Sequence, residues 1–533
     1  MKRKIAYVAG LILTLTLFSI KASSQMLNES AFKIDRTFSL IDAFYVDTVN
    51  DSMLAEKAII EILRNLDPHS TYISAKDVKE MNEPLNGNFE GIGIQFNLLR
   101  DTIIVIEPIA HGPAEKVGIK AGDRIVRIDT ENVAGIGIST SGVRSRLMGR
   151  KGTKVNVSVV RRGQKGLLSF TIIRDKIPIY SLDAAYMLDG ETGYIKLNKF
   201  AATTDKEFTD AVDRLKKQNM KNLVLDLRGN GGGYMLAATA VADKFFADPR
   251  LIVYLVGRKT PRQDYKSQGS GILSSDRLVV LTDEGSASAS EILAGAIQDW
   301  DRGVIMGRRT FGKGLVQNGF YLNDGSMIRL TVARYYTPTG RCIQRPYNEG
   351  YDKYMENFYK RFTDGELLSA DSVHYKDSLK YKTLINKRPV YGGGGIMPDV
   401  FVSVDTTYNS PYFNRLYAHN VLNTFTLEYY DKNRDDLNAK YPTFQAFKDN
   451  FQFSPDDIKD FIAKGEADGV KYNEEQFNKS KKEILLILKA LVATNIWQTN
   501  EYFQIVNQDD KVIKRALNVI SDKKLYNHIL GND

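Results

Sequence analysis

The sequence predicts a multidomain α/β protein, and three observations support this fold class. Residues 176–405 alternate strand-like and helix-like runs, which is typical of layered α/β structure. Residues 85–175 contain several short strand-like runs, which predict a β-rich module. The segments 25–84 and 406–533 have apolar residues at helical spacing, so we expect an N-terminal helical segment and a helical C-terminal extension.

Length and composition limit the functional classes. A chain of 533 residues is too long for a single core. Its 43% hydrophobic and 26% charged residues are typical of a globular protein. The net charge of +9 is modest and the basic residues are scattered, so we predict no nucleic-acid partner, while peripheral contact with an anionic membrane surface stays open. Cys342 is the only cysteine, which excludes an internal disulfide.

Residues 1–24 predict an export signal. Residues 1–4 are basic, residues 5–20 form an apolar run, and the small residues 22–24 are suited to cleavage. The run is shorter than the ~20 apolar residues that span a bilayer, so cleavage is favoured over a retained anchor. We therefore expect an exported protein of the periplasm or cell envelope.

The first segment of the exported chain predicts a helical hairpin. Residues 29–66 place apolar side chains on helical faces, and Asp67, Pro68 and His69 interrupt the pattern. The hairpin could pack on the body of the protein or form a homodimer interface.

Residues 85–175 predict strands at 92–98, 103–106, 124–128, 154–161 and 167–173, with helices at 114–118 and 140–147. Gly91, Ile92, Gly93 and Ile94 lead into an exposed strand, where free backbone N–H groups could bind a carboxylate while a peptide adds to the sheet edge. The alternative is a hairpin turn without a ligand. Together with residues 113–125, the pattern resembles a PDZ domain, which implies that these four residues bind peptide.

The core predicted at 176–405 has strands at 193–197, 222–227, 251–256, 277–281, 304–307 and 326–332, and helices at 205–218, 234–246 and 288–300. A polar stretch rich in tyrosine and lysine, residues 346–387, interrupts this order, and we expect a surface insertion there. We connect no motif beyond residue 405 with chemistry.

Two turns of this core could serve catalysis. The strand ending at residue 227 runs into the glycine loop, residues 229–233, whose backbone N–H groups near a helix N-terminus could stabilise an oxyanion. A phosphate site or a plain turn is the alternative. Residues 285–291 (GSASASE) place serines between a strand and a helix, where a hydroxyl projects out of the sheet and the Ala289 N–H faces the same point. Helix N-capping is the other interpretation of these serines.

Lys313, flanked by two glycines, is the candidate general base. Its reference pKa is about 10.4, so burial would have to lower it by roughly 2 to 3 units for the neutral amine to act. Gln317 follows four positions later and could orient the amine. Residues 307–313 imitate a phosphate-binding loop, but Gly314 stands where a hydroxyl would hold Mg²⁺, so we reject a nucleotide site.

These motifs, together with residues 66–70 and 392–399, resemble the C-terminal processing (tail-specific) peptidases over about residues 30–405. The resemblance implies a core with crotonase/Clp-like layers. It also implies Ser288 as nucleophile, Lys313 as base and Gln317 as its support. The oxyanion hole would consist of N–H groups of Ala289 and of Gly231 or Gly232.

We therefore expect an exported serine endopeptidase that recognises unfolded or flexible protein C-termini through its PDZ module and cleaves with a Ser–Lys dyad. The reaction needs no cofactor and no metal. A homodimer and a regulatory adaptor are open alternatives for its partners. Two other functions are a PDZ scaffold or holdase that does not cleave, and an esterase or amidase acting on small molecules.

Overall fold

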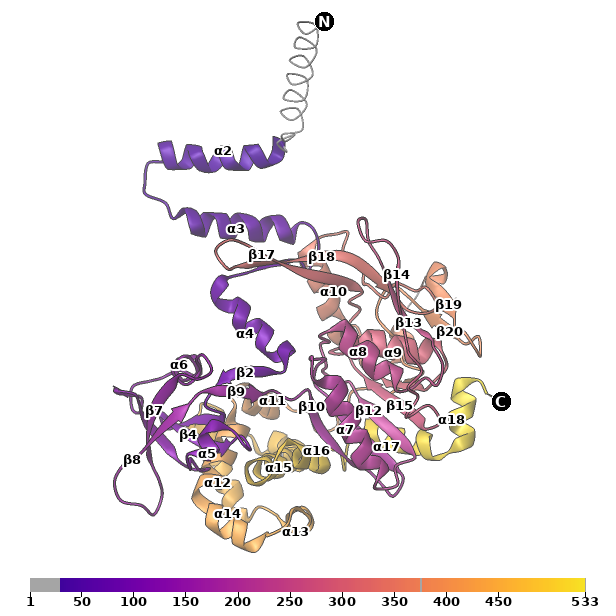
Figure 1. Ribbon diagram of the computed structural model, residues 1–533. Helices are drawn as coiled ribbons and strands as arrows, with labels where there is room; N and C mark the ends of the chain where they lie inside the picture. Colours follow the sequence, from indigo (N-terminus) through magenta and orange to yellow (C-terminus); the bar gives the residue numbers. More distant parts are fainter. Residues whose placement is uncertain (1–28, 374–375, 533) are drawn as a thin grey trace, which may run out of the picture. The chain divides into compact units, whose positions relative to one another are not determined.

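The computed structural model describes residues 29–373 and 376–532, and the chain divides into two units, residues 1–72 and 73–533 (Figure 1). The predicted export signal, residues 1–24, lies outside the described residues. Among the residues that are described, no helix is both long and apolar enough to cross a membrane.

The first unit contains the two predicted helices, α2 (Glu29–Phe44) and α3 (Asp51–Arg64). The side chain of Asn50 caps α3 by accepting a hydrogen bond from the N–H of Met53. Beyond α3, the Asp67 carboxylate accepts hydrogen bonds from the N–H groups of His69 and Ser70, which forms the turn that the sequence predicted. The homodimer interface stays a prediction.

The second unit begins with α4 and the β-rich module. Its elements are α4 (Ala75–Asn86), β2 (Asn88–Gly91), β3 (Ile94–Leu99), β4 (Thr102–Pro108), α5 (Pro113–Lys116), β5 (Arg124–Ile128), β6 (Glu131–Asn132), α6 (Thr140–Leu147), β7 (Lys154–Val160), β8 (Leu168–Ile173) and β9 (Asp175–Pro178). The sheet has the order β3-β4-β5-β7-β8, with β6 on β5, and β2 pairs with β9. Every predicted strand and helix of this module is confirmed, and β3 lies at the sheet edge.

The core contains a six-stranded sheet of order β10-β11-β12-β15-β16-β21. Strand β10 is antiparallel to β11 and the other pairs are parallel. The elements are β10 (Leu182–Met187), β11 (Thr192–Leu197), α7 (Thr204–Lys216), β12 (Asn222–Asp226), α8 (Met235–Asp243), β15 (Arg277–Thr282), α9 (Ala289–Asp299), β16 (Val304–Gly307) and β21 (Val400–Phe401). The predicted α/β alternation is confirmed.

A second group of strands in the core is antiparallel. β13 (Leu251–Val256) pairs with β14 (Gln263–Lys266) and with β18 (Met327–Tyr336), and β18 also pairs with β17 (Leu315–Tyr321). The stretch 346–387 contains α10 (Tyr351–Thr363), the short helices η1 (Ala370–Ser372) and η2 (Asp377–Leu379), and β19 (Lys380–Lys382), which pairs with β20 (Pro389–Tyr391). Sequence reasoning missed α10, β10, β14 and β17.

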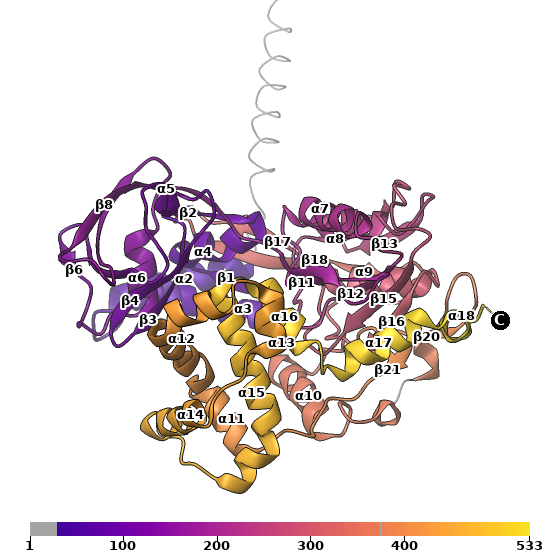
Figure 2. The ribbon, with the colours of Figure 1, turned by 90° about the horizontal axis from the view of Figure 1, so that it is seen from below.

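Both faces of the six-stranded sheet are covered by helices. Successive side chains of a strand point to opposite faces, so neighbouring residues of β12 contact different helices. Leu223 and Leu225 of β12 pack with the residues of α7, α8 and α9, whereas Val224 packs with α17 (Lys511–Ser521) and α18 (Lys523–Leu530). Figure 2 shows α17 and α18 beside β15 and β16. The end of the predicted C-terminal extension is therefore part of the core built on the six-stranded sheet.

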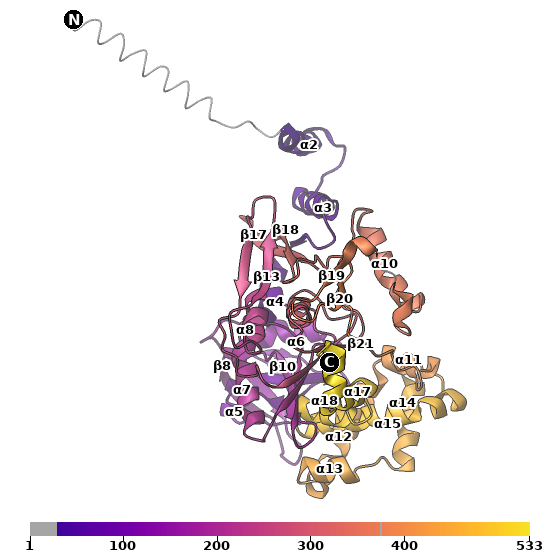
Figure 3. The same ribbon diagram turned by 90° about the vertical axis from the view of Figure 1, so that its right-hand side faces the viewer.

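The rest of the extension is a helical bundle. Its helices are α11 (Pro411–Ala418), α12 (Val421–Lys440), α13 (Phe444–Asn450), α14 (Pro455–Ala467), α15 (Glu474–Ile496) and α16 (Thr499–Val506). Figure 3 shows α11 to α15 gathered together, and α16 packs on α15. Aromatic side chains such as Phe425 and Phe461 fill its interior. The helical character predicted for residues 406–533 is confirmed.

The position of α17 generates a stability prediction. Ile513 is 1% exposed against the sheet, so Ile513→Ala should lower the free energy of unfolding by about 2–5 kcal/mol. Leu236→Ala, at a side chain that is 64% exposed, is the control and should stay within about 0.5 kcal/mol of the wild type. Urea unfolding followed by circular dichroism measures both. Equal stability of the two variants would contradict the assignment of α17 to the core.

Candidate active site

The serine turn, residues 283–288, joins β15 to α9. Ser288 has φ 55° and ψ −111°, a backbone conformation that is unusual for a residue with a side chain. Ser286 and Ser290 are fully buried, and their hydroxyls donate to the carbonyls of Leu227 and Asn230, both at 2.8 Å. Ser288 is half-buried. The tight turn therefore leaves Ser288 as the most accessible of the three serines.

The lysine loop, residues 309–314, is joined to this turn by the buried carboxylate of Glu291, in the first turn of α9. Oε2 accepts hydrogen bonds from the N–H of Ser288 at 2.8 Å and the N–H of Lys313 at 2.9 Å. Oε1 accepts from the N–H of Gly312 at 2.7 Å and the hydroxyl of Thr310 at 2.5 Å. One side chain thus fixes the backbones of both candidate dyad residues.

Burial raises the pKa of Glu291 to about 7, against the opposite effect of its hydrogen-bond donors. Sequence reasoning missed this residue. The spacing Ser288-x-x-Glu291 is that of a capping box, which is a recognisable signal for the contact within the turn. The capping-box spacing does not predict the contacts of Glu291 with the lysine loop.

Tyr335 of β18 forms a second link between the two segments. Its hydroxyl lies 2.7 Å from the carbonyl oxygen of Lys313 and 3.1 Å from that of Ser288. Burial raises the pKa of Tyr335 well above its ordinary value, so the phenol stays protonated and can donate. Lys313 itself is half-buried. The structure therefore brings Ser288 and Lys313 into one hydrogen-bonded cluster.

The glycine loop packs directly against Ser288. Gly232 has φ +100°, and a methyl group on it would come within 2.9 Å of both the Ala289 nitrogen and Ser288 Cβ. The N–H of Gly232 donates to Asn230 Oδ1 at 2.9 Å. Because that N–H is already engaged, the geometry favours Gly231 over Gly232 as the second oxyanion donor beside Ala289.

A buried ion-pair network holds the strand that enters the glycine loop. Asp226 is fully buried and pairs with Arg228 at 2.7 Å, and the hydroxyl of Tyr194 donates to it at 2.8 Å. Burial alone would raise the pKa of Asp226, but Arg228 and Lys196 lower it well below its usual range. Arg228 also pairs with Asp510, the N-cap of α17, at 2.7 Å. The last helices are thereby tied to the loop.

Gln317 lies in β17, immediately after a register shift between Val316 and Gln317. Its Nε2 donates to Thr331 Oγ1 on β18 at 3.3 Å. Such a bulge changes the simple alternation of side chains along a strand. The role of Gln317 in orienting the lysine stays a prediction.

The predicted peptide-binding loop lies between β2 and β3. Gly93 has φ +74°, and the carbonyls of Ile92 and Gly93 accept hydrogen bonds from the N–H groups of Ala114 and Ile109, both at 2.9 Å. The side chains of β3 contribute partly buried apolar groups to the module's core, which also contains residues of α6. The loop is therefore held rigidly beside an edge strand.

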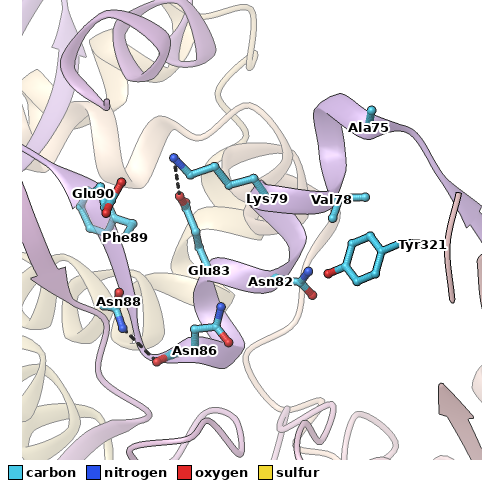
Figure 4. A pocket seen from close by; sticks show the side chains of 10 residues that line it. All are labelled: Ala75, Val78, Lys79, Asn82, Glu83, Asn86, Asn88, Phe89, Glu90 and Tyr321. Atoms are coloured by element: carbon cyan, nitrogen blue, oxygen red, sulfur yellow. Dashed lines mark hydrogen bonds and ion pairs between the residues drawn. The ribbon is translucent and has the colours of Figure 1, made fainter. Parts of the chain in front are cut away.

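A polar pocket of about 440 Å³ lies next to this module (Figure 4). It is lined by Ala75, Val78, Lys79, Asn82, Glu83, Asn86, Asn88, Phe89, Glu90 and Tyr321. The Glu83 carboxylate is 3.8 Å from the Lys79 ammonium, on the same face of α4. None of the predicted site residues lines this pocket.

Comparison with known proteins assigns families to three parts of the chain. The model of peptidase family S41 matches residues 191–350, which include Ser288, Lys313 and Gln317. A PDZ domain matches residues 91–172, which include the loop at residues 91–94. Residues 412–498 match a family of unknown function, DUF8443.

Curated relatives are similar over the same region. The carboxy-terminal processing protease CtpA of Bacillus subtilis is 34% identical over 346 residues, 62% of this chain and 72% of the relative. CtpB of the same organism is 35% identical over 59% of this chain and 65% of its own length. The carboxy-terminal-processing protease of Bartonella bacilliformis is 33% identical over 64% and 80%, respectively. Among solved structures, the photosystem II D1 C-terminal processing protease is 33% identical over 59% of this chain and 84% of that chain, with a TM-score of 0.35.

The fold, the serine turn and these matches define a serine-type peptidase with a PDZ domain. The chain belongs to the carboxy-terminal processing proteases of peptidase family S41.

The environment of Glu291 generates a prediction on pH. Because its pKa in the folded chain, about 7, lies above the ordinary 4.5, its stabilising contribution is full below pH 4.5 and is lost as the pH rises to about 7. Glu291→Gln should remove this part of the pH dependence. It should also lower the free energy of unfolding by about 1–3 kcal/mol, because the amide NH₂ cannot accept the backbone N–H groups.

Urea unfolding at a series of pH values between about 4.5 and 7.5 measures both effects. Glu475→Gln, at an exposed carboxylate on α15, is the control and should keep the wild-type pH dependence. A Glu291→Gln variant whose stability changes with pH as the wild type does would contradict the assignment.

Proposed function

We propose that this protein is an exported endopeptidase that captures protein C-termini with its PDZ domain and cleaves them with a dyad of the Ser288 hydroxyl and the Lys313 amine. Export rests on residues 1–24 of the sequence. The names of the relatives support processing at the C-terminus. The assignment of the dyad rests on the local geometry.

The observation that carries the proposal is the double link between the two segments. Glu291 Oε2 accepts from the N–H groups of both Ser288 and Lys313, and the Tyr335 hydroxyl lies within hydrogen-bond distance of both carbonyls. These links fix the separation of the two backbones. A nucleophile and its base require such a frame, because proton transfer depends on a short and reproducible contact between their side chains.

The reaction follows from these positions. The neutral amine of Lys313 takes the hydroxyl proton of Ser288 while Oγ attacks the scissile carbonyl carbon. The N–H groups of Ala289 and Gly231 stabilise the oxyanion. The tetrahedral intermediate collapses to an acyl-enzyme, the leaving amine takes the proton back from Lys313, and water then hydrolyses the ester by the same route.

Substrate capture uses the PDZ domain. An extended C-terminal segment adds to the free edge of β3, and its carboxylate binds the backbone N–H groups of the loop at residues 91–94. The partly buried apolar side chains of β3, Ile94, Phe96 and Leu98, favour apolar residues in the bound tail. Recognition of the terminal carboxylate gives the enzyme its preference for chain ends.

Removing either dyad group tests the chemistry. Ser288→Ala and Lys313→Ala should each lower kcat for an unfolded protein substrate by on the order of 10⁴-fold or more, because the two groups act as a unit. Binding of a labelled C-terminal peptide should stay at the wild-type level. Lys382→Ala, at an exposed lysine of β19, is the control and should cleave normally. Cleavage by Lys313→Ala at the wild-type rate would refute the lysine's role.

Blocking the substrate's carboxylate tests the capture step. A peptide with an amidated C-terminus should be cleaved with a kcat/KM about tenfold or more below that of the same peptide with a free carboxylate, since a hydrogen bond to a charged group contributes about 1.5–3 kcal/mol. Fluorescence anisotropy with the Ser288→Ala protein measures the affinity for both peptides directly. Equal affinities would exclude recognition of the chain end.

A further inference from the structure

The backbone N–H groups of the lysine loop donate hydrogen bonds to the peptidase core. The N–H of Thr310 donates to the carbonyl of Ile396, and the N–H of Phe311 donates to the carbonyl of Ser286. The N–H groups of Gly312 and Lys313 donate to the Glu291 carboxylate. These bonds fix one side of the loop. The carbonyls at the start of the loop need partners as well, because buried backbone acceptors are stable only when they are bonded.

Those partners come from α10, which lies beyond the residues that match the S41 family model. Arg361, near the C-terminal end of α10, donates from Nη2 to the carbonyl of Arg309 at 2.7 Å and from Nη1 to the carbonyl of Thr310 at 3.0 Å. Its Nε donates to the carboxylate of Glu366 at 2.8 Å. Arg361 is 4% exposed, so these contacts are shielded from water.

The planar guanidinium suits this role, because it presents several N–H donors in a fixed geometry. Glu366 extends the network, since it also accepts two hydrogen bonds from Arg309 at the start of the loop, at 2.9 and 2.5 Å. Arg361 therefore binds the loop twice directly and once more through Glu366.

The face of α10 toward the loop is consistent with this contact. Tyr354, Phe358 and Arg361 recur at i, i+4 and i+7, so they share one side of the helix. The ring of Phe358 lies 4.9 Å from that of Phe311 in the loop. The Arg345 guanidinium stands 4.5 Å from the Phe311 ring and 4.1 Å from the Tyr354 ring.

The prediction of a surface insertion at residues 346–387 is thus wrong for the inner side of α10. Tyr354 and Arg361 are buried, while most of the other α10 side chains face solvent. The sequence shows a polar, aromatic-rich stretch because a helix of this kind carries one buried stripe among exposed polar residues.

We propose that Arg361 is a positioning residue for the peptidase reaction, which holds the lysine loop so that Lys313 meets Ser288. It acts through the backbone of Arg309 and Thr310 and does not touch the substrate. The inference rests on the proposed role of Lys313 as the base. In this proposal, α10 contributes to catalysis through the contacts of Arg361 described above.

The test uses the full chain with Arg361→Met and Arg361→Lys. Methionine keeps an unbranched, flexible side chain but has no donor, so two carbonyls lose their partner and Glu366 keeps only Arg309. Lysine keeps the charge but cannot reproduce the planar fork. Lys360→Met is the matched control, because Lys360 is the neighbouring residue, is exposed, and pairs with Glu356 on α10 itself.

Steady-state kinetics with a free-carboxylate peptide, and anisotropy with an uncleavable C-terminal peptide, give the readouts. Arg361→Met should lower kcat by on the order of 10²-fold, as small displacements of a catalytic group do, with KM and peptide affinity within about twofold of the wild type. Arg361→Lys should recover part of kcat, and Lys360→Met should match the wild type.

A folded Arg361→Met with the wild-type kcat overturns the inference, and so does a loss that falls on KM and peptide affinity. If Arg361→Met does not fold, Glu366→Gln decides: a reduced kcat at unchanged KM supports the role of the network, and a wild-type kcat overturns it. The proposed function is tested separately. An active Lys313→Ala enzyme would refute the proposed role of Lys313 as the base. An inactive Lys313→Ala enzyme together with a fully active Arg361→Met enzyme would refute only the inference on α10.

Discussion

The active site depends on one buried carboxylate that joins two segments of the chain. Glu291 lies in the first turn of α9 beside the serine turn, and its oxygens accept four hydrogen bonds, of which two come from the lysine loop backbone. Without it, these buried N–H groups would be unsatisfied, at a cost of about 1–3 kcal/mol each. The loop therefore adopts the position in which its N–H groups reach the carboxylate. Burial makes this link specific, because no water competes for the carboxyl oxygens.

The supports of this link come from parts of the chain that are distant in sequence. Tyr335 belongs to the antiparallel strands, Arg361 to α10, and Asp510 to the start of α17. The proposed reactive residues, Ser288 and Lys313, lie inside the region that matches the S41 family model, whereas Arg361 and Asp510 lie beyond it. Helices after residue 350 thus complete both the hydrogen bonds of the lysine loop and the packing of the sheet. Family-level resemblance proposes the reacting groups, while contacts from several parts of the second unit position the backbones of Ser288 and Lys313.

Much of the fold follows from local pattern. Strands buried on both faces form continuous apolar runs, so β12 and β15 were predicted nearly to the residue. The segment of β17 could not be recognised in the same way, because Gln317 and Gly319 interrupt its alternation and a bulge shifts its register. Its order comes from pairing with β18 and not from its own propensity. The buried side of α10 was missed for a related reason. An arginine in a polar stretch is expected at the surface, and only the structure shows the buried partners of Arg361.

For the site, the sequence proposes the reactive residues, Ser288 and Lys313, but does not show what holds them. A serine between strand and helix and a lysine between glycines are local signals, whereas the contact of Glu291 with Lys313 joins residues on either side of β16. This contact also answers a chemical difficulty. A carboxylate near an amine favours the charged ammonium, which could not act as a base. Here the carboxylate oxygens accept hydrogen bonds from main-chain N–H groups and a hydroxyl, so Glu291 orders the loop through its backbone. A glutamate can therefore hold the segment of the proposed lysine base, because it binds the backbone of Lys313 and not its amine.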